Sequence, residues 1–317
     1  MAVVSAHVEF SPSELAEHEA IIARGSEAMS HCLEAPEMQG FHKRVVEERA
    51  ATLHRIRKAR GIDVKQSLDR RTKEDWLKWV SITHENDRGH SRDPQDLFNF
   101  RWPEPSKKDP ACILAPTNIY GPYWRDGKQV ERQDIRARQP GIYLRLALQV
   151  FDVNTCKPVH GSQVDIWHAN AVGVYSDKVD GFLRGWQPSS VHGTVDFDTI
   201  FPGHYTQRTT HIHITVHPPK ESRYSHFGMV YFDDELITEI EKKDPYPNNK
   251  AQRVFNQYDG NAPIDSTKLY DPFLQWAWIG NRVEDGVLAW KTLGVNLTDK
   301  GIKQPPGRRS LIDYHLD

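Results

Sequence analysis

Cysteine is scarce in this sequence, which has only Cys32, Cys112 and Cys156 among 317 residues. Three cysteines are too few for the disulfide framework of a small secreted domain, and their spacing matches no metal-binding pattern. This count fits a reducing compartment, and we predict a cytoplasmic protein. One pair remains able to form a bridge if the protein is exported.

Long apolar runs and an excess of one charge are also missing. No stretch approaches the roughly 20 apolar residues that a membrane-spanning helix needs, and residues 1–14 lack the basic and apolar regions of a signal peptide. The 41 Lys and Arg residues nearly balance the 43 Asp and Glu residues, so no strong field favours nucleic acid or an anionic membrane. We find no internal repeat, glycine-rich phosphate loop or nucleophile elbow. We therefore expect neither nucleic acid nor membrane as a partner, while the length allows an enzyme.

The first third of the sequence has helical periodicity. Ser11 is a candidate N-cap and Pro12 suits the first position of a helix. Further helices are predicted over residues 38–60, where Gly61 provides the stop, and over residues 72–84. Because such helices usually bury an apolar stripe against a partner surface, we expect a helical domain used for packing or for a homodimer.

The periodicity changes after a polar connector at residues 87–110, which is rich in Asp, Asn and Pro. Residues 142–150 alternate with a period of two, and the short runs QVDIWHA, TVDFDTI, HIHITVH and GMVYFDD are separated by turn residues. This pattern is typical of a β-sandwich or a barrel. We predict a mainly β protein, with a helical N-terminal domain and linker over residues 1–105 and a β-sandwich catalytic domain over residues 106–317.

Residues 201–217, FPGHYTQRTTHIHITVH, concentrate side chains that can bind a metal. On a strand, residues two apart face the same side, so His211 and His213 stand together with backbones about 6.6 Å apart. Both imidazoles can then reach one ion at about 2.0 to 2.2 Å. A structural or surface role explains the pair alone equally well. The neighbours Tyr205 and Arg208 favour a site, because a cation beside a metal makes sense when the bound substrate is an anion.

Four longer motifs occur in order, and the last of them includes residues 201–217. They are CILAPTNIYGPYWRDG at 112–127, PVHGSQVDIWHANAVGVYSD at 158–177, FLRGWQPSS at 182–190 and GTVDFDTIFPGHYTQRTTHIHITVH at 193–217. Together they resemble the intradiol ring-cleaving dioxygenases, most of all the fungal intradiol dioxygenase-like branch. The resemblance covers residues 112–235, and the preceding helical region is similar to the amino-terminal helices of that family.

The resemblance implies a metal centre. By position, Tyr175, Tyr205, His211 and His213 match the four protein ligands of a mononuclear non-haem iron(III). Two phenolates and a hydroxide neutralise its three positive charges, whereas Fe(II) oxygenases use two histidines and one carboxylate. The family opens catechol or hydroxyquinol-type rings with O2 between the hydroxyl-bearing carbons, giving cis,cis-muconate-type products. On this basis Tyr205 leaves the metal and acts as an internal base, and Arg208 stabilises the ketonised ring. The alternative for Arg208 is a surface ion pair.

The segment NIYGPYW resembles the TEGPYY segment of the family, which forms part of the wall around the aromatic substrate. The resemblance implies that Pro122, Tyr123 and Trp124 enclose a flat ring, although core packing explains each of them equally well. Tyr120 replaces the glutamate of the family, so the shape of the pocket and the substrate preference are open to change.

A second departure concerns the predicted substrate pocket, where Met229 stands in place of a glutamine of the family. Methionine cannot donate a hydrogen bond. Either another group such as Gln187 or His204 donates the hydrogen bond in place of that glutamine, or ring cleavage is slower, or the substrate differs.

Other polar residues in these motifs have weaker claims. We expect His217 to be structural and His168 to pack or to lie behind the site. A solvated loop is the interpretation for Asp177, Asp180 and Arg184, with the mouth of the pocket as the alternative.

Two other functions stay open. A cupin-like metal oxygenase or hydrolase would use His211 and His213 with Fe(II) or Zn, but its glutamate should follow closely, and the nearest here is Glu221. The other is a non-catalytic β-sandwich that binds phenolics or a partner protein, which the replacement of the family's glutamine by Met229 leaves open. The expected partners are a catecholic substrate and O2, with the substituents of the ring left open.

Overall fold

The computed structural model describes residues 12–62, 75–80, 82–86, 112–114, 123–124, 129–177, 181–219, 226–262, 266 and 271–298. The helices in this part are α1 (Pro12–Glu34), α2 (Pro36–Ala59), α3 (Asp75–Val80) and α5 (Asp234–Glu241), with short 3-10 turns η1 (Tyr246–Asn248), η2 (Asn256–Tyr258) and η4 (Val283–Asp285). The predicted boundary between residues 105 and 106 lies outside the described residues. No helix of the described part is long and apolar enough to span a membrane.

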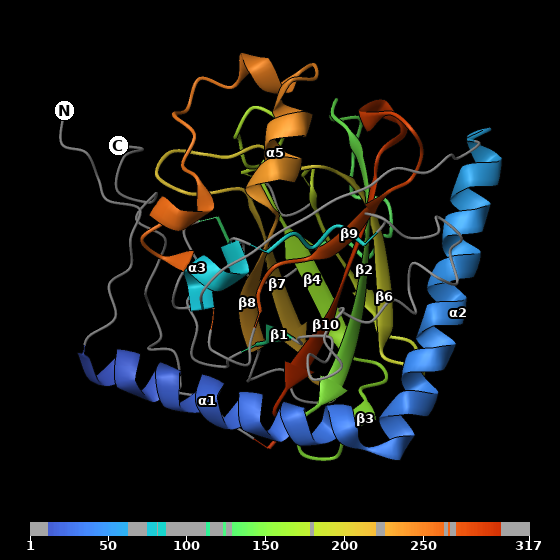
Figure 1. The fold of residues 1–317 in the computed structure, drawn as a ribbon, viewed down its shortest axis with the longest axis vertical. Coiled ribbons are helices and arrows are strands. Elements are labelled where there is room, and N and C mark those ends of the chain that lie inside the picture. The colour runs from blue at the N-terminus through green and yellow to red at the C-terminus, as the bar shows by residue number, and fades with distance from the viewer. Residues whose placement is uncertain are drawn as a thin grey trace.

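The strands form two sheets (Figure 1). The six-stranded sheet has the order β1-β10-β2-β3, with β6 also paired to β2 and β9 to β10, and the four-stranded sheet has the order β5-β4-β7-β8. The strands of the six-stranded sheet are β1 (Cys112–Ile113), β2 (Tyr143–Asp152), β3 (Lys157–Pro158), β6 (Thr194–Ile200), β9 (Gln275–Trp278) and β10 (Val287–Val295). Those of the four-stranded sheet are β4 (Gln163–Trp167), β5 (Arg184–Pro188), β7 (His211–His217) and β8 (His226–Tyr231). The protein is mainly β, as predicted.

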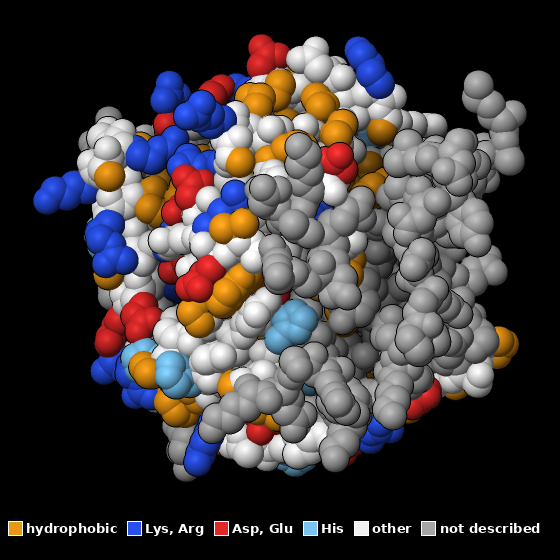
Figure 2. Space-filling model, turned by 180° about the vertical axis from the view of Figure 1, so that it is seen from behind, with side chains coloured by type: hydrophobic (Ala, Val, Ile, Leu, Met, Phe, Trp, Pro, Cys, Tyr) orange, Lys and Arg blue, Asp and Glu red, His pale blue; other side chains and the backbone are white. Residues whose placement is uncertain are grey.

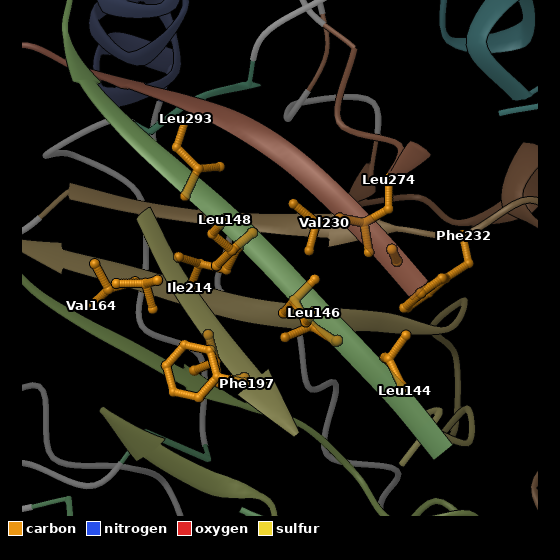
Figure 3. Close-up of a cluster of buried hydrophobic side chains, with 14 of the residues drawn as sticks. Leu144, Leu146, Leu148, Val164, Phe197, Ile214, Val230, Phe232, Leu274 and Leu293 are labelled. Carbon is orange, nitrogen blue, oxygen red and sulfur yellow. The ribbon is translucent and has the colours of Figure 1, made fainter. Parts of the chain in front are cut away.

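One hydrophobic core joins the two sheets (Figure 3). Leu144, Leu146 and Leu148 of β2 contribute one face of that strand, and Val164 and Ile214 contribute from the four-stranded sheet. Alternate side chains of residues 142–150 enter this core, which explains the period of two in the sequence.

The opposite face of β2 is also buried. Ala147 lies in a second hydrophobic cluster with Val46, Ala50 and Leu53, which come from α2. α2 thus packs its apolar stripe on the six-stranded sheet, beside which it runs in Figure 1. α1 contributes Ile21 to the core shared by the sheets.

The predicted helices are present, with one difference in length. α1 starts at Pro12, and α2 is followed by Gly61 with a φ of +63°, as expected for a helix stop. The third helix ends at Val80 rather than continuing to His84. The backbone N–H of His84 donates to Asp233, so tertiary contacts replace the helical ones there.

A disulfide connects Cys32 in α1 with Cys156, which lies in the turn between β2 and β3. The structure thus shows the alternative in which one pair forms a bridge. Disulfides persist in oxidising compartments, so the cysteine count no longer supports a cytoplasmic location.

Charges of both signs are interspersed over the described residues on the face shown in Figure 2. This matches the near balance of 41 basic and 43 acidic residues in the sequence. Over the described residues of this face, neither sign of charge covers a broad area.

Candidate metal centre

Strand β7 presents two histidines side by side. Ile212 and Ile214 of this strand enter the core, so His211 and His213 face the opposite side. Their Nε2 atoms lie 3.2 Å apart, and their ring centroids are 4.8 Å apart. The sequence prediction that the two imidazoles share one face is confirmed.

The surroundings fix how these imidazoles can bind. Nδ1 of His211 lies 2.7 Å from the carbonyl oxygen of Thr209, so Nδ1–H donates there and the lone pair of Nε2 points into the site. The His213 ring stacks on Trp167 with centroids 4.8 Å apart. Burial lowers the pKa of both histidines far below the ordinary value, and the charge of Arg208 lowers both further. Both rings are thus neutral, the form in which imidazole binds a metal.

Two loops bring phenol groups to the histidines. Tyr175 follows β4 in the loop at residues 168–177, and Tyr205 lies in the turn at residues 201–210 before β7. The loops touch backbone to backbone, because a Cβ atom at Gly173 would lie 2.3 Å from the carbonyl oxygen of His204. A Cβ atom at Gly203 would lie 2.4 Å from that of Ala171. Glycine at both contacts lets the loops meet and fixes the distance between their tyrosines.

The phenol oxygens have unusual surroundings. The hydroxyl of Tyr175 is buried and has no hydrogen-bond partner among the described residues, and that of Tyr205 lies 3.5 Å from Nε2 of His211. The ring centroids of Tyr175 and Tyr205 lie 5.3 Å apart. Burial raises the pKa of Tyr205 to about 12, against the opposing charge of Arg208, and raises that of Tyr175 well above its ordinary value.

These four groups suit a metal ion. A buried hydroxyl without a partner is costly, and a cation between the two imidazoles and the two phenols would satisfy all four. Within the described ranges, no group of three or more His, Cys, Asp or Glu side chains is arranged to hold a metal ion. Among the described residues, the phenols of Tyr175 and Tyr205 are the candidates for further ligands of the histidine pair.

Tyr123 lies in the same aromatic cluster. Its ring stacks on that of Tyr175 with centroids 4.1 Å apart and an interplanar angle of 2°, and it meets the Tyr205 ring edge to face at 5.6 Å. Trp124 lies one layer away, against Trp167 at 4.8 Å. Pro122 lies outside the described residues. Of the predicted aromatic wall, the structure thus brings Tyr123 to the phenols and places Trp124 behind His213.

Arg184 holds this cluster together, which the sequence analysis missed. It is the first residue of β5 and is 1% exposed, so the expectation of a solvated loop is wrong for it. Its Nη2 donates to the carbonyl oxygens of Tyr123 and Ser176. These bonds tie the chain at Tyr123 to the loop of Tyr175. Asp177 is exposed, as expected, and Asp180 lies outside the described residues.

Arg208 is buried rather than part of a surface ion pair. It is 6% exposed, and its Nε lies 2.9 Å from Asp259. Its Nη2 lies 3.5 Å from Sδ of Met229 and 3.3 Å from the hydroxyl of Tyr231. Met229 is thus next to the arginine, where the resemblance implied a pocket residue. Asp259 lies in none of the quoted motifs, and Tyr231 lies in the run GMVYFDD without any sign of a role at the site.

Gln187 and His204 are the candidates to replace the glutamine of the family as hydrogen-bond donor, and both side chains bond elsewhere. Gln187 donates to the carbonyl oxygen of Asp196. His204 bonds to Glu241 at 2.7 Å and to the carbonyl oxygen of Ala251 at 3.1 Å. Both side chains are thus committed to other parts of the fold.

Two other histidines of the motifs, His217 and His168, have structural partners, as predicted. His217 lies 3.2 Å from Asp165. His168 bonds through Nε2 to the hydroxyl of Thr199 at 2.7 Å, and burial lowers its pKa to about 4. Neither is needed to complete the cluster of two imidazoles and two phenols.

Comparisons with known proteins bear on the family that the sequence resembles. Residues 119–241 match the family model Dioxygenase_C, described as dioxygenase. An intradiol ring-cleavage dioxygenase from Tetranychus urticae is 28% identical, with a TM-score of 0.50 over 60% of this chain and 96% of that chain. A second solved structure, dioxygenase Tetur07g02040, is 28% identical, with a TM-score of 0.51 over 61% of this chain and 96% of its own. No curated protein matches. The resemblance to intradiol ring-cleavage dioxygenases is confirmed.

Proposed function

We propose that this protein is an Fe(III)-dependent intradiol dioxygenase that opens catechol or hydroxyquinol-type rings with O2 to cis,cis-muconate-type products. The observation that carries the proposal is the convergence of four side chains, with Nε2 of His211 3.2 Å from Nε2 of His213 and the hydroxyl of Tyr175 buried without a partner in the described part of the chain. We also propose that the two sheets form a β-sandwich catalytic domain and that the N-terminal helices mediate a homodimer.

The donor set favours ferric iron, since two phenolates are hard anionic ligands. The chemistry that Fe(III) supplies when bound is withdrawal of electron density from a catecholate ring, which makes the ring reactive towards O2. Tyr175, Tyr205, His211 and His213 would hold the ion.

Tyr205 is the proposed internal base. Its pKa of about 12 makes it a strong proton acceptor once it is a free phenolate. A catechol hydroxyl that loses its proton to the Tyr205 oxygen becomes the anionic ligand that the site requires. The residue sits in a turn rather than in the sheet, and its ring meets those of Tyr123, Tyr175 and His211 edge to face.

Arg208 supplies positive charge for the anionic ring. Its guanidinium is buried beside the site, where a charge acts more strongly than in water. Tyr123 and Tyr175 add flat aromatic faces at the same place. The chain thus provides both an apolar surface and a cation for a catecholate.

The proposal is tested with the iron-loaded protein and the variant Tyr205→Phe. Ferric phenolates absorb visible light, so the wild type should be coloured, and catechol should shift its band. The variant should lose or shift the band and lose about 10²- to 10⁴-fold in kcat, the usual contribution of a proton-transfer residue. Tyr143→Phe is the control, because Tyr143 bonds to Asp198 on the six-stranded sheet. A colourless, iron-loaded and fully active protein would contradict the assignment.

Met229 beside Arg208 favours one second candidate, a protein that binds phenolics without turnover. Oxygen uptake with catechol and with hydroxyquinol separates the two functions, and identification of the product gives the cleaved bond. An iron-replete sample that binds catechol but consumes no O2 would favour the binding protein. Sedimentation of the same sample tests the homodimer.

A further inference from the structure

We propose that Asp259 is a positioning residue that orients two groups of the metal centre, the guanidinium of Arg208 and the imidazole of His211. The inference rests on the proposed function, because these two groups matter only if the site binds iron and a catecholate. Asp259 follows η2, about fifty residues after Arg208 in the sequence.

The carboxylate of Asp259 is fully engaged. It is 2% exposed, and its oxygens lie 3.1 and 2.9 Å from Nε of Arg208. One oxygen also accepts the backbone N–H of Thr209 at 2.8 Å, and the other accepts those of Asn261 and Ala262 at 2.9 and 3.0 Å. Five hydrogen-bond contacts from three directions leave this side chain little freedom to move.

The first consequence concerns Arg208. Asp259 holds Nε, while Nη2 reaches Met229 and Tyr231, so contacts at two points fix the plane of the guanidinium. A planar guanidinium held at two points presents its remaining N–H groups in one direction. Asp259 therefore sets where the positive charge stands relative to the phenols.

The second consequence concerns His211, through the peptide of Thr209. The N–H of Thr209 is held by Asp259, its carbonyl oxygen accepts Nδ1–H of His211 at 2.7 Å, and its hydroxyl donates to Asn256 at 2.6 Å. The residue is thus anchored by the segment at residues 256–259. Because the Nδ1 bond fixes the tautomer and the ring direction, Asp259 indirectly aims the Nε2 lone pair.

A matched control exists elsewhere in the fold. Asp271 is also fully buried and bonds to a buried cation, Lys291, at 2.8 Å. In the described part of the chain its other charged neighbour is His84, and none of its hydrogen bonds there leads to the four-residue cluster. Removing either carboxylate disrupts a buried ion pair, but only Asp259 should affect the metal centre.

The experiment compares D259N with D271N in the full-length iron-loaded protein. D259N should lower kcat for catechol about 10- to 100-fold, the usual effect of a residue that orients a metal ligand, and should lower iron affinity in competition with a chelator by a similar factor. D271N should lower thermal stability at least as much as D259N does. It should leave kcat and iron affinity within about twofold of the wild type. D259N that behaves like D271N in both measurements overturns the proposal.

A double-variant cycle separates the two routes. If the effect on kcat passes through Arg208, R208M/D259N should be no slower than R208M, whereas independent effects would multiply. The loss of iron affinity should persist in the R208M background, because it passes through Thr209. If D259N does not fold, this same comparison decides the question, since the double variant leaves no unpaired buried charge. Equal iron affinities of R208M and R208M/D259N would then overturn the proposal.

The same measurements distinguish failure of the proposed function. A wild-type protein that binds iron but does not cleave catechol or hydroxyquinol removes the ring-cleavage function, while the iron affinities of D259N and D271N still decide the role of Asp259. If the wild type is active and the D259N variant keeps its kcat and iron affinity, the role of Asp259 is overturned while the proposed function stands.

Discussion

Breaking the disulfide between Cys32 and Cys156 should lower the free energy of unfolding without undocking α1. The bridge spans 124 positions of sequence. Closing a loop of that size removes entropy from the unfolded chain worth about 5 kcal/mol, and measured values for disulfides are typically about 2–4 kcal/mol. We therefore expect Cys156→Ser to cost about 2–5 kcal/mol.

The folded state should change little, because α1 has other attachments. Ile21, Ile22 and Met29 of this helix are buried in the core that the sheets share. The loss should therefore come mainly from a more expanded unfolded chain, which also exposes more surface. The denaturant m-value of Cys156→Ser should accordingly increase.

Urea unfolding followed by circular dichroism measures both quantities. Cys32→Ser, Cys156→Ser, the double variant and the reduced wild type should all give the same free energy, since each removes the same bond. Cys112→Ser is the control, because the bridge does not involve Cys112. If a reducing agent leaves the urea midpoint and the m-value of the wild type unchanged, the reasoning is refuted.

Two further perturbations follow from the described contacts. Burial alone would lower the pKa of His84, but Asp233 and Asp271 outweigh it and raise the pKa from 6.5 to about 9. The stabilisation is thus complete below about pH 6.5 and is lost as the pH rises through about 9, a loss of about 3 kcal/mol that urea unfolding should detect in the wild type and not in His84→Gln. A flat wild-type profile over that window would contradict this ion cluster. Gly173→Ala should abolish iron binding, because its new Cβ atom would lie 2.3 Å from a backbone oxygen. Gly161→Ala, with a similar positive φ and nothing within 4 Å, should cost only about 1 kcal/mol and keep the iron, and equal effects of the two variants on iron affinity would refute the loop contact.

The sequence predicted those parts of the site that depend on local spacing. His211 and His213 are two apart on a strand, so their common face follows from the backbone alone. Tyr175 and Tyr205 came from the resemblance, since each lies in a loop whose path no periodicity specifies. Their proximity depends on the contact between the two loops, which is tertiary.

The residues that support the site could not be predicted in this way. Asp259 meets Arg208 across 51 positions of sequence, and Arg184 meets Tyr123 across 61. Charged residues are usually exposed, so a buried role leaves no mark in composition or pattern. The disulfide was equally hidden, because two cysteines 124 positions apart carry no information about their separation in space.

The position of β10 affects how the chain can fold during synthesis. β10 lies in the middle of its sheet, parallel to β2 along its whole length, although about 135 residues separate the end of β2 at Asp152 from the start of β10 at Val287. At about 5–20 residues per second, β2 waits roughly 7–27 s on the ribosome for this neighbour. During that time its inner edge is open to other nascent chains, so a truncation before Val287 should yield an aggregating fragment rather than a smaller enzyme.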